Sequence, residues 1–182
     1  MSRIEDVLDV YEEDYNEKRP VICMDESTKQ LLQDVREPLP TRPASPAKED
    51  YAYKRNGTAN LFVACESQIG QRHISVTAQH NTAVDFAYFM QGIERCYAQA
   101  DIIRVVLDNL RTHGAKSFYE AFEPEEARRL AKRFELHYTP KHGSWLNMAE
   151  IELASLNKRC LNRRIPDEAT LKREVGVYEW GT

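Results

Sequence analysis

Two short apolar runs, each followed by an aspartate, constrain the fold of this chain more than any other feature. The run Ile102–Leu107 is apolar except for Arg104 and is followed by Asp108, and the run Val21–Met24 is followed by Asp25. Short apolar runs of this kind are typical of strands that are buried on both faces of a sheet. Burial on both faces requires helices on both sides, so the two runs predict an α/β fold.

The rest of the chain supplies the other elements of such a fold. Apolar spacing predicts an amphipathic helix with an acidic outer face over 3–15, and β-type runs at 60–65 and 73–78 predict a hairpin. Further helices are expected from Thr82 to about Ala100, within 117–134 with a restart at Pro124, from Ser144 to about Arg163, and from Glu168, with a short strand at 136–138. We therefore expect a mixed five-stranded sheet flanked by helices.

The length of 182 residues suits one domain with additions at its ends. We divide the chain into an acidic N-terminal helix (1–18), a main domain (19–175) and a tail (176–182) that we interpret as truncated. A proline-rich loop at 36–58 separates the first two strands of the main domain. A loop of this length within a compact domain is usually functional.

Composition excludes several classes of protein. The chain is 42% hydrophobic, which is enough for a packed core, and it has no apolar run near the ~20 residues that span a bilayer. The acidic N-terminus lacks the apolar region of a signal peptide, so we expect a cytoplasmic protein. The four cysteines are scattered and form no Cys-x-x-Cys pair, which indicates reduced core thiols rather than zinc ligands or disulfides.

The net charge of −4 does not exclude a nucleic-acid partner, because the charge is unevenly distributed. The acids are concentrated in residues 1–18, and bases gather late in the chain. These bases are Arg128, Arg129, Lys132, Arg133, Lys141, Lys158, Arg159, Arg163 and Arg164. A basic face that binds nucleic acid and a solvated helix surface of mixed charge both fit this pattern.

Asp25 and Asp108 are candidate metal ligands. In open α/β sheets, ligands bind beyond the carboxyl ends of the strands, so both side chains would emerge together if their strands are neighbours. Neighbouring carboxylates repel each other unless a cation lies between them, and their oxygens suit Mg²⁺ or Mn²⁺. Glu150 and Glu152 flank the apolar stripe of the helix at 144–163 at similar angles, so helical spacing does not choose between them as a third ligand.

Three segments resemble the signature blocks of the DDE transposases, in the bacterial insertion-sequence branch of the mariner superfamily. They are Cys23-Met24-Asp25-Glu26-Ser27, Val105-Val106-Leu107-Asp108-Asn109, and the segment TPKHGSWLNMAE at 139–150. The resemblance covers about residues 19–175 and implies an RNase H-like fold. In the third block the catalytic glutamate follows Leu-Asn by three positions, which corresponds to Glu150 and leaves Glu152 as a flanking residue.

The resemblance implies a DDE endonuclease that cleaves DNA phosphodiesters at transposon ends and transfers the strands, with two Mg²⁺ or Mn²⁺ ions. Asp25 would bridge both ions, Asp108 would hold one and Glu150 the other. Asn109 and His113 would position a phosphate or the attacking group, although His113 could equally cap the following segment. Asn147 lies beside Glu150 and is a further supporting residue.

Double-stranded DNA, both transposon ends and target, is the implied partner. The candidate DNA contacts are Lys54, Arg55, Lys141, Trp145, Arg163 and Arg164. We expect Trp145 on the core side of its helix, where packing competes with base stacking. His137 and His142 lack the additional cysteine or acid that would complete a zinc site.

Members of the family carry an N-terminal helix-turn-helix module, whereas here only about 18 residues, rich in Asp and Glu, precede the first strand. We therefore expect a homodimer, or a partner chain that carries the module. Asp108 and Glu150 are separated by 41 residues, more than is usual in mariner-like enzymes, and we place the extra length at 117–134. Two alternatives remain open: a truncated, inactive remnant that binds DNA or a partner, and a stand-alone RNase H-like nuclease.

Overall fold

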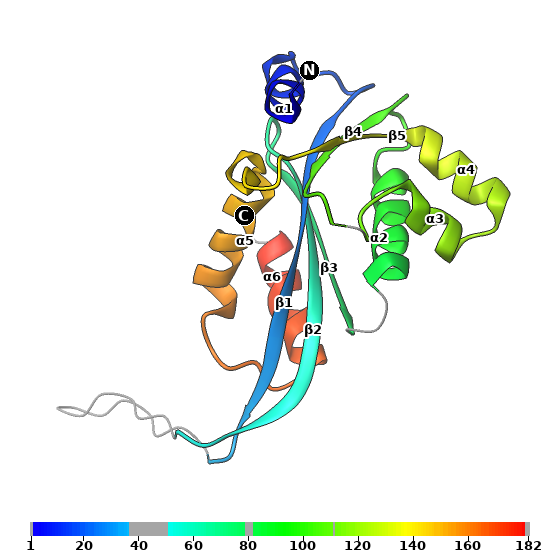
Figure 1. The fold of residues 1–182 in the computed structure, drawn as a ribbon. Helices are drawn as coiled ribbons and strands as arrows, with labels where there is room; N and C mark the ends of the chain where they lie inside the picture. Colours follow the sequence, from blue (N-terminus) through cyan, green and yellow to red (C-terminus); the bar gives the residue numbers. More distant parts are fainter. Residues whose placement is uncertain (1, 37–50, 79–81, 111, 181–182) are drawn as a thin grey trace.

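The computed structural model describes residues 2–36, 51–78, 82–110 and 112–180, and it shows one five-stranded sheet between helices (Figure 1). The strand order is β3-β2-β1-β4-β5. The strands are β1 (Val21–Asp34), β2 (Tyr53–Glu66), β3 (Gln71–Ala78), β4 (Ile103–Leu107) and β5 (Phe134–Tyr138). β1 pairs antiparallel with β2 and parallel with β4, which confirms the predicted mixed sheet.

Helices cover both faces of this sheet. The helices are α1 (Arg3–Glu12), α2 (Thr82–Cys96), α3 (Ala115–Ala121), α4 (Pro124–Arg133), α5 (Ala149–Leu156) and α6 (Glu168–Trp180). Side chains of α2, α3 and α4 form one core cluster with Ile22, Met24 and the odd-numbered residues of β4. α1, α5 and α6 lie on the other face, where two further clusters form.

β4 is buried along its whole length, as its sequence predicts. Its single charged residue, Arg104, is 1% exposed, and its Nη2 donates to the carbonyl oxygen of Arg19 at 2.8 Å. Nη1 of Arg104 also pairs with Glu13. Arg104 therefore fixes the segment after α1 to the central strand, because a buried guanidinium requires such partners.

β1 and β2 are longer than the sequence predicts. β1 continues past Asp25 to Asp34, and β2 begins at Tyr53, inside the segment 36–58 that we predicted as a loop. The added residues are mostly polar, so no apolar run marks them, and backbone pairing between the two strands defines them. Residues 37–50 of the predicted loop lie outside the described residues.

The segment predicted as one helix from Ser144 to Arg163 is divided into three parts. A 3₁₀ turn at Ser144–Leu146 precedes α5, and a π-helical turn at Asn157–Leu161 follows it. Asn147 lies between the 3₁₀ turn and α5, and its extended backbone angles, φ −84° and ψ 107°, separate the two. α6 begins at the predicted Glu168 and includes residues 176–180, with Tyr178 packed in the core, although we predicted a tail there.

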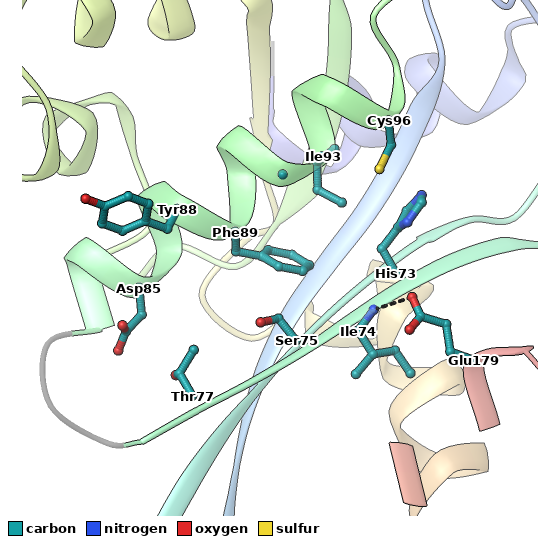
Figure 2. Close-up of a pocket in the computed structure, with 11 residues that line it drawn as sticks. His73, Ile74, Ser75, Thr77, Asp85, Tyr88, Phe89, Ile93, Cys96 and Glu179 are labelled. Atoms are coloured by element: carbon teal, nitrogen blue, oxygen red, sulfur yellow. Dashed lines mark hydrogen bonds between the residues drawn. The ribbon is translucent and has the colours of Figure 1, made fainter. Parts of the chain in front are cut away.

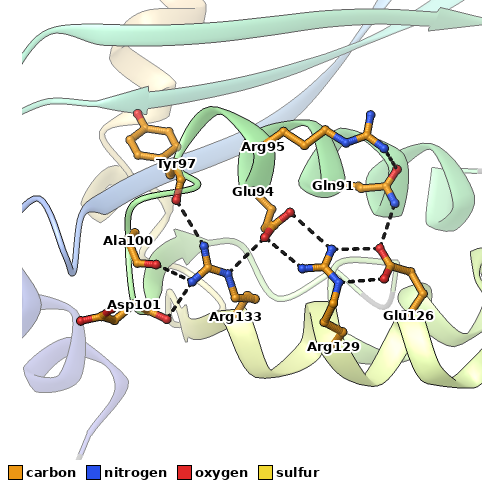
Figure 3. A network of polar contacts seen from close by, with 9 residues as sticks. All are labelled: Gln91, Glu94, Arg95, Tyr97, Ala100, Asp101, Glu126, Arg129 and Arg133. Carbon is orange, nitrogen blue, oxygen red and sulfur yellow. Dashed lines mark hydrogen bonds and ion pairs between the residues drawn. The ribbon is translucent and has the colours of Figure 1, made fainter.

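Two arginines of α4, Arg129 and Arg133, are turned toward α2 and pair with Glu94 there (Figure 3). Arg129 contacts Glu126 at 2.8 Å and Glu94 at 3.0 Å, and Arg133 contacts Glu94 at 3.2 Å. The hydrogen bonds from Arg129 are the main reason that the pKa of Glu126 falls to about 2. These two arginines dock α4 onto α2, so they do not form the basic face that charge counting allowed.

All four cysteines are free thiols, as expected. Cys23 and Cys65 are buried, whereas Cys96 is exposed, so the prediction of a core position is wrong for Cys96. Cys96 is the last residue of α2, where it lines a cavity together with residues of β3. No helix in the described part of the chain is long and apolar enough to span a membrane.

Candidate active site

The register of β1 and β4 places Asp25 beside Asp108. Val21, Ile22 and Cys23 pair with Arg104, Val105 and Val106, and the two aspartates lie two residues beyond the last pair on each strand. Alternate residues of a strand share a face, so Asp25 faces the same side as Cys23, toward α1 and α5. β4 ends before Asp108 as predicted, whereas Asp25 lies where β1 loses its parallel neighbour and continues beside β2 alone.

Asn147 connects the start of α5 to β1 next to Asp25. Its Nδ2 donates to the carbonyl oxygen of Met24 at 2.9 Å, and its Oδ1 accepts from the backbone N–H of Ala149 at 3.2 Å. Asn147 is 2% exposed, so both hydrogen bonds are protected from water. They hold the first turn of α5, which carries Glu150, against the strand that carries Asp25.

Electrostatic coupling shows that the three predicted acids lie near one another. The pKa of Asp25 is raised to about 6, mainly by burial and also by the negative charges of Asp108 and Glu150, against a hydrogen bond from the Glu26 backbone. That N–H donates to Oδ1 of Asp25 at 2.8 Å. Within the described residues, however, no three His, Cys, Asp or Glu side chains are already arranged around a metal position.

His113 lies between two carboxylates at the end of β4. Its Nδ1 is 2.7 Å from Oδ1 of Asp108, and its Nε2 is 2.9 Å from Oε2 of Glu26. Burial alone would lower the pKa of His113, but the hydrogen bonds to Asp108 and Glu26 outweigh burial and raise it to about 9. His113 is therefore a cation that orients Asp108, and its ring, stacked on Phe86 at 4.9 Å, does not cap the next segment.

Sequence reasoning missed the role of Glu26. Its carboxylate is 10% exposed and its partner His113 is 1% exposed, so the pair is part of the core. A signal was available, because alternation from buried Met24 places Glu26 on the α2 side of the sheet. Asn109, the neighbour of Asp108, is exposed.

Glu152 has a structural role that separates it from Glu150. Its Oε1 lies 3.0 Å from Nε of Arg72 and accepts a hydrogen bond from the Tyr178 hydroxyl at 2.7 Å. These partners belong to β3 and α6, on the far side of α5 from Asp25. The two glutamates that helical spacing could not distinguish therefore have different surroundings.

The candidate DNA contacts fall into two separate groups. Lys141 and Trp145 lie in the segment that leads to Glu150, and both are exposed. The expectation that Trp145 packs against the core is wrong: it is 71% exposed, and Leu146 is buried in its place. The 3₁₀ turn causes this exchange, because it rotates residues differently from a continuous α-helix.

The second group lies at the far end of the β1–β2 pair. Arg55 is opposite Leu32, whereas Val63 is opposite Asp25, so Arg55 is about 27 Å along the strand from the aspartate. Lys54 is also exposed at this end. Arg163 pairs with Glu174 at 2.6 Å, and Arg164 pairs with Asp34 at 2.5 Å, so both have carboxylate partners.

A cavity of about 340 Å³ lies between β3 and α2, away from the three acids (Figure 2). His73 and Thr77 of β3 face Phe89 and Asp85 of α2 across it. Burial lowers the pKa of His73. None of the catalytic, metal-binding or DNA-binding residues predicted from the sequence lines this cavity.

Comparison with known proteins identifies the class to which this fold and site belong. The family model described as DDE superfamily endonuclease matches residues 20–172, so the chain belongs to that family. A search of curated proteins found no significant sequence match.

Among solved structures, the fold is similar to that of Mos1 transposase. The Mos1 strand transfer complex superposes with a TM-score of 0.65 at 12% identity over 99% of this chain. The Mos1 paired-end complex with the left transposon end gives 0.66 at 13%, and the Mos1 mariner paired-end complex with Mn gives 0.65 at 14%. The chain spans about half of the Mos1 chains, 52% and 53% in these cases. The likeness confirms the predicted RNase H-like fold.

Proposed function

We propose that this chain is the catalytic domain of a DNA transposase from the bacterial insertion-sequence branch of the mariner superfamily. It would cleave DNA phosphodiesters at transposon ends and join them to target DNA. The observation that carries the proposal is that Asp25 and Asp108 follow paired segments of neighbouring strands, with the α5 turn that carries Glu150 held at β1, in a chain of the DDE endonuclease family.

Asp25, Asp108 and Glu150 would together hold the divalent metal ions. Their donor set consists of oxygens only, which suits Mg²⁺ or Mn²⁺. The neighbouring negative charges that raise the pKa of Asp25 would be offset by cations. When bound, such ions activate the attacking water or 3′-hydroxyl and stabilise the leaving oxygen.

Two residues would position these ligands. The cationic ring of His113 orients Asp108 through a 2.7 Å hydrogen bond and is itself fixed by Glu26. Asn147 holds the α5 turn that carries Glu150 at β1 through its bond to Met24. A preorganised ligand set loses less freedom when a metal binds.

DNA would lie across the site and along the extended β1–β2 pair. Lys141 and Trp145 are placed to contact DNA near the carboxylates. Lys54 and Arg55 would contact phosphates about eight base pairs away, given ~27 Å along the strand and ~3.4 Å per base pair. We place recognition of the transposon ends on a second subunit or a partner chain that carries a helix-turn-helix module.

Mn²⁺-dependent nicking of supercoiled plasmid tests this function, with Glu150→Gln compared with Glu152→Gln. We expect Glu150→Gln to lose nicking while the chain remains folded. Glu152→Gln should keep nicking and lower the thermal midpoint, because it weakens the contacts with Arg72 and Tyr178.

Equal loss of nicking in both variants would contradict the assignment of Glu150. Absence of nicking by the folded unsubstituted chain would favour an inactive remnant. Equal cleavage of RNA–DNA hybrid would favour a stand-alone RNase H-like nuclease.

A further inference from the structure

Two cysteines face each other across β1 and β2, next to the candidate active site. Cys23 and Cys65 are register partners in the antiparallel pair. Both are free thiols in the same buried cluster. The other two cysteines, Cys96 and Cys160, belong to neither strand.

The backbone geometry of this pair suits a disulfide. The N–H of Arg104 donates to the carbonyl oxygen of Pro20 at 3.0 Å, so even-numbered residues at the start of β1 direct their backbone groups to β4. Cys23 therefore directs its backbone groups to Cys65. Antiparallel partners that exchange both backbone hydrogen bonds have Cα atoms ~5.5 Å apart, within the ~4.4–6.8 Å range of disulfides.

A small oxidant can reach one of the two thiols. Cys65 is 7% exposed and lines a cavity of about 210 Å³ together with Arg72, Met148 and Glu152. Cys23 is fully buried behind it. The accessible thiol therefore has its partner in place, with no third thiol required.

We propose that Cys23 and Cys65 are a site of reversible oxidation that forms an intramolecular disulfide with peroxide-type oxidants. The Cys65 thiol reacts with hydrogen peroxide as the O–O bond breaks, which gives a sulfenic acid and one water. The Cys23 sulfur then displaces the hydroxyl group as a second water while the S–S bond forms. The pair loses two electrons and two protons, which reduce one hydrogen peroxide to two waters, and a dithiol reductant restores both thiols.

The disulfide would act on the neighbouring carboxylate, a consequence that rests on the proposed function. Cys23 precedes Asp25 by two residues on the same face of β1. The Tyr11 hydroxyl lies 3.2 Å from Sγ of Cys23 and donates to the carbonyl oxygen of Leu146 at 2.8 Å, in the turn before α5. Forming the S–S bond rearranges these contacts, so we expect the oxidised chain to bind Mn²⁺ several-fold more weakly.

The test uses the chain with Cys96→Ser and Cys160→Ser, so that only the proposed pair remains. After treatment with hydrogen peroxide, alkylation in denaturant and mass spectrometry count the free thiols. We expect two alkylated thiols before oxidation, none after it, and two again after dithiothreitol. Peptide mapping should identify a Cys23–Cys65 cross-link, and Cys65→Ser in the same background should give no such product. In urea the cross-link should form more slowly, because the strands no longer align the thiols.

The proposal is overturned if both thiols stay alkylatable while Cys96 of the unsubstituted chain is oxidised under the same conditions. Equal rates in buffer and in urea would also overturn it. Unchanged Mn²⁺ affinity of the cross-linked chain would overturn the link to Asp25. Failure of the reduced chain to bind Mn²⁺ would count against the proposed function alone, because the thiol assay needs no metal.

Discussion

Asp25 and Glu26 are consecutive residues of β1, but their side chains lie on opposite faces of the sheet and have opposite surroundings. Asp25 faces α5, receives one hydrogen bond from the Glu26 backbone, and has its pKa raised to about 6 by burial and by neighbouring acids. Glu26 faces α2 and is paired with the cationic ring of His113. The face of Asp25 therefore concentrates negative charge, whereas on the other face the charge of Glu26 is neutralised by His113.

The difference indicates how one strand can carry a candidate metal ligand, Asp25, on one face and a residue that stabilises the site, Glu26, on the other. A carboxylate without a cationic partner costs stability until a cation binds, whereas a paired carboxylate contributes stability. Asp108 is shared between the two faces, because it lies beside Asp25 and accepts the hydrogen bond from His113. The comparison predicts that substitutions on the two faces have opposite effects on stability in metal-free buffer.

Asp25→Asn should have the largest effect. We expect nicking to fall by at least ~10³-fold, because a lost metal ligand removes several kcal/mol of transition-state stabilisation. In metal-free buffer at pH 7.5 the same variant should be more stable by about 1–3 kcal/mol, since the charged form of Asp25 is disfavoured above its folded pKa of about 6. Urea unfolding measures the second effect.

Glu26→Gln is the matched variant on the other face. It should lower metal-free stability, because His113 loses a charged partner at 2.9 Å, and should retain Mn²⁺ binding. Stability changes of the same sign in both variants would contradict the comparison.

His113 should give stability a distinct pH dependence in metal-free buffer. Its pKa is raised from 6.5 to about 9 on folding, so its contribution is complete below pH 6.5 and is lost as the pH rises through 9. The expected loss is up to about 3 kcal/mol. Urea unfolding of the unsubstituted chain and of His113→Gln between pH 6 and 9.5 measures this, and parallel profiles would argue against a protonated His113.

Asn147→Ala should lower the free energy of unfolding by about 1–3 kcal/mol, because it leaves the buried Met24 carbonyl and Ala149 N–H without their partner. Mn²⁺ affinity should fall as well, since α5 is no longer held at β1. Asn157→Ala, at an exposed position after α5, is the matched control and should change neither quantity appreciably. Normal Mn²⁺ affinity in a folded Asn147→Ala chain would remove Asn147 from the site.

Trp145→Ala should have the smallest effect. Because Trp145 is 71% exposed, stability should change by less than about 0.5 kcal/mol. Affinity for DNA, measured by fluorescence anisotropy, should fall by about 1 kcal/mol, roughly fivefold, if a base stacks on the ring. Tyr119→Ala removes an exposed aromatic ring from α3 on the other face, so an equal loss of affinity there would indicate non-specific contacts.

The order of strands and helices along the chain, and the central strands of the sheet, could be predicted from the amino-acid sequence alone. The run at β4 is apolar enough that only burial on both faces satisfies it, and its end before Asp108 is marked by the change to polar residues. The resemblance of 139–150 to a family block selected Glu150, which helical spacing alone did not, and its catalytic role stays a prediction. These features are local, so they can be predicted from neighbouring residues.

The full lengths of β1 and β2, the roles of Glu26 and Glu152, and the exposure of Trp145 could be read only from the three-dimensional structure. The polar halves of β1 and β2 are strands because they pair with each other, and no local pattern records such pairing. The role of Glu26 depends on His113, which is 87 residues away in the sequence. The role of Glu152 depends on Arg72 of β3 and Tyr178 of α6. The exposure of Trp145 depends on a break at Asn147 that is stabilised by a hydrogen bond to β1. Contacts between distant segments set these outcomes, because the energy of a buried polar group depends on which partner the fold brings to it.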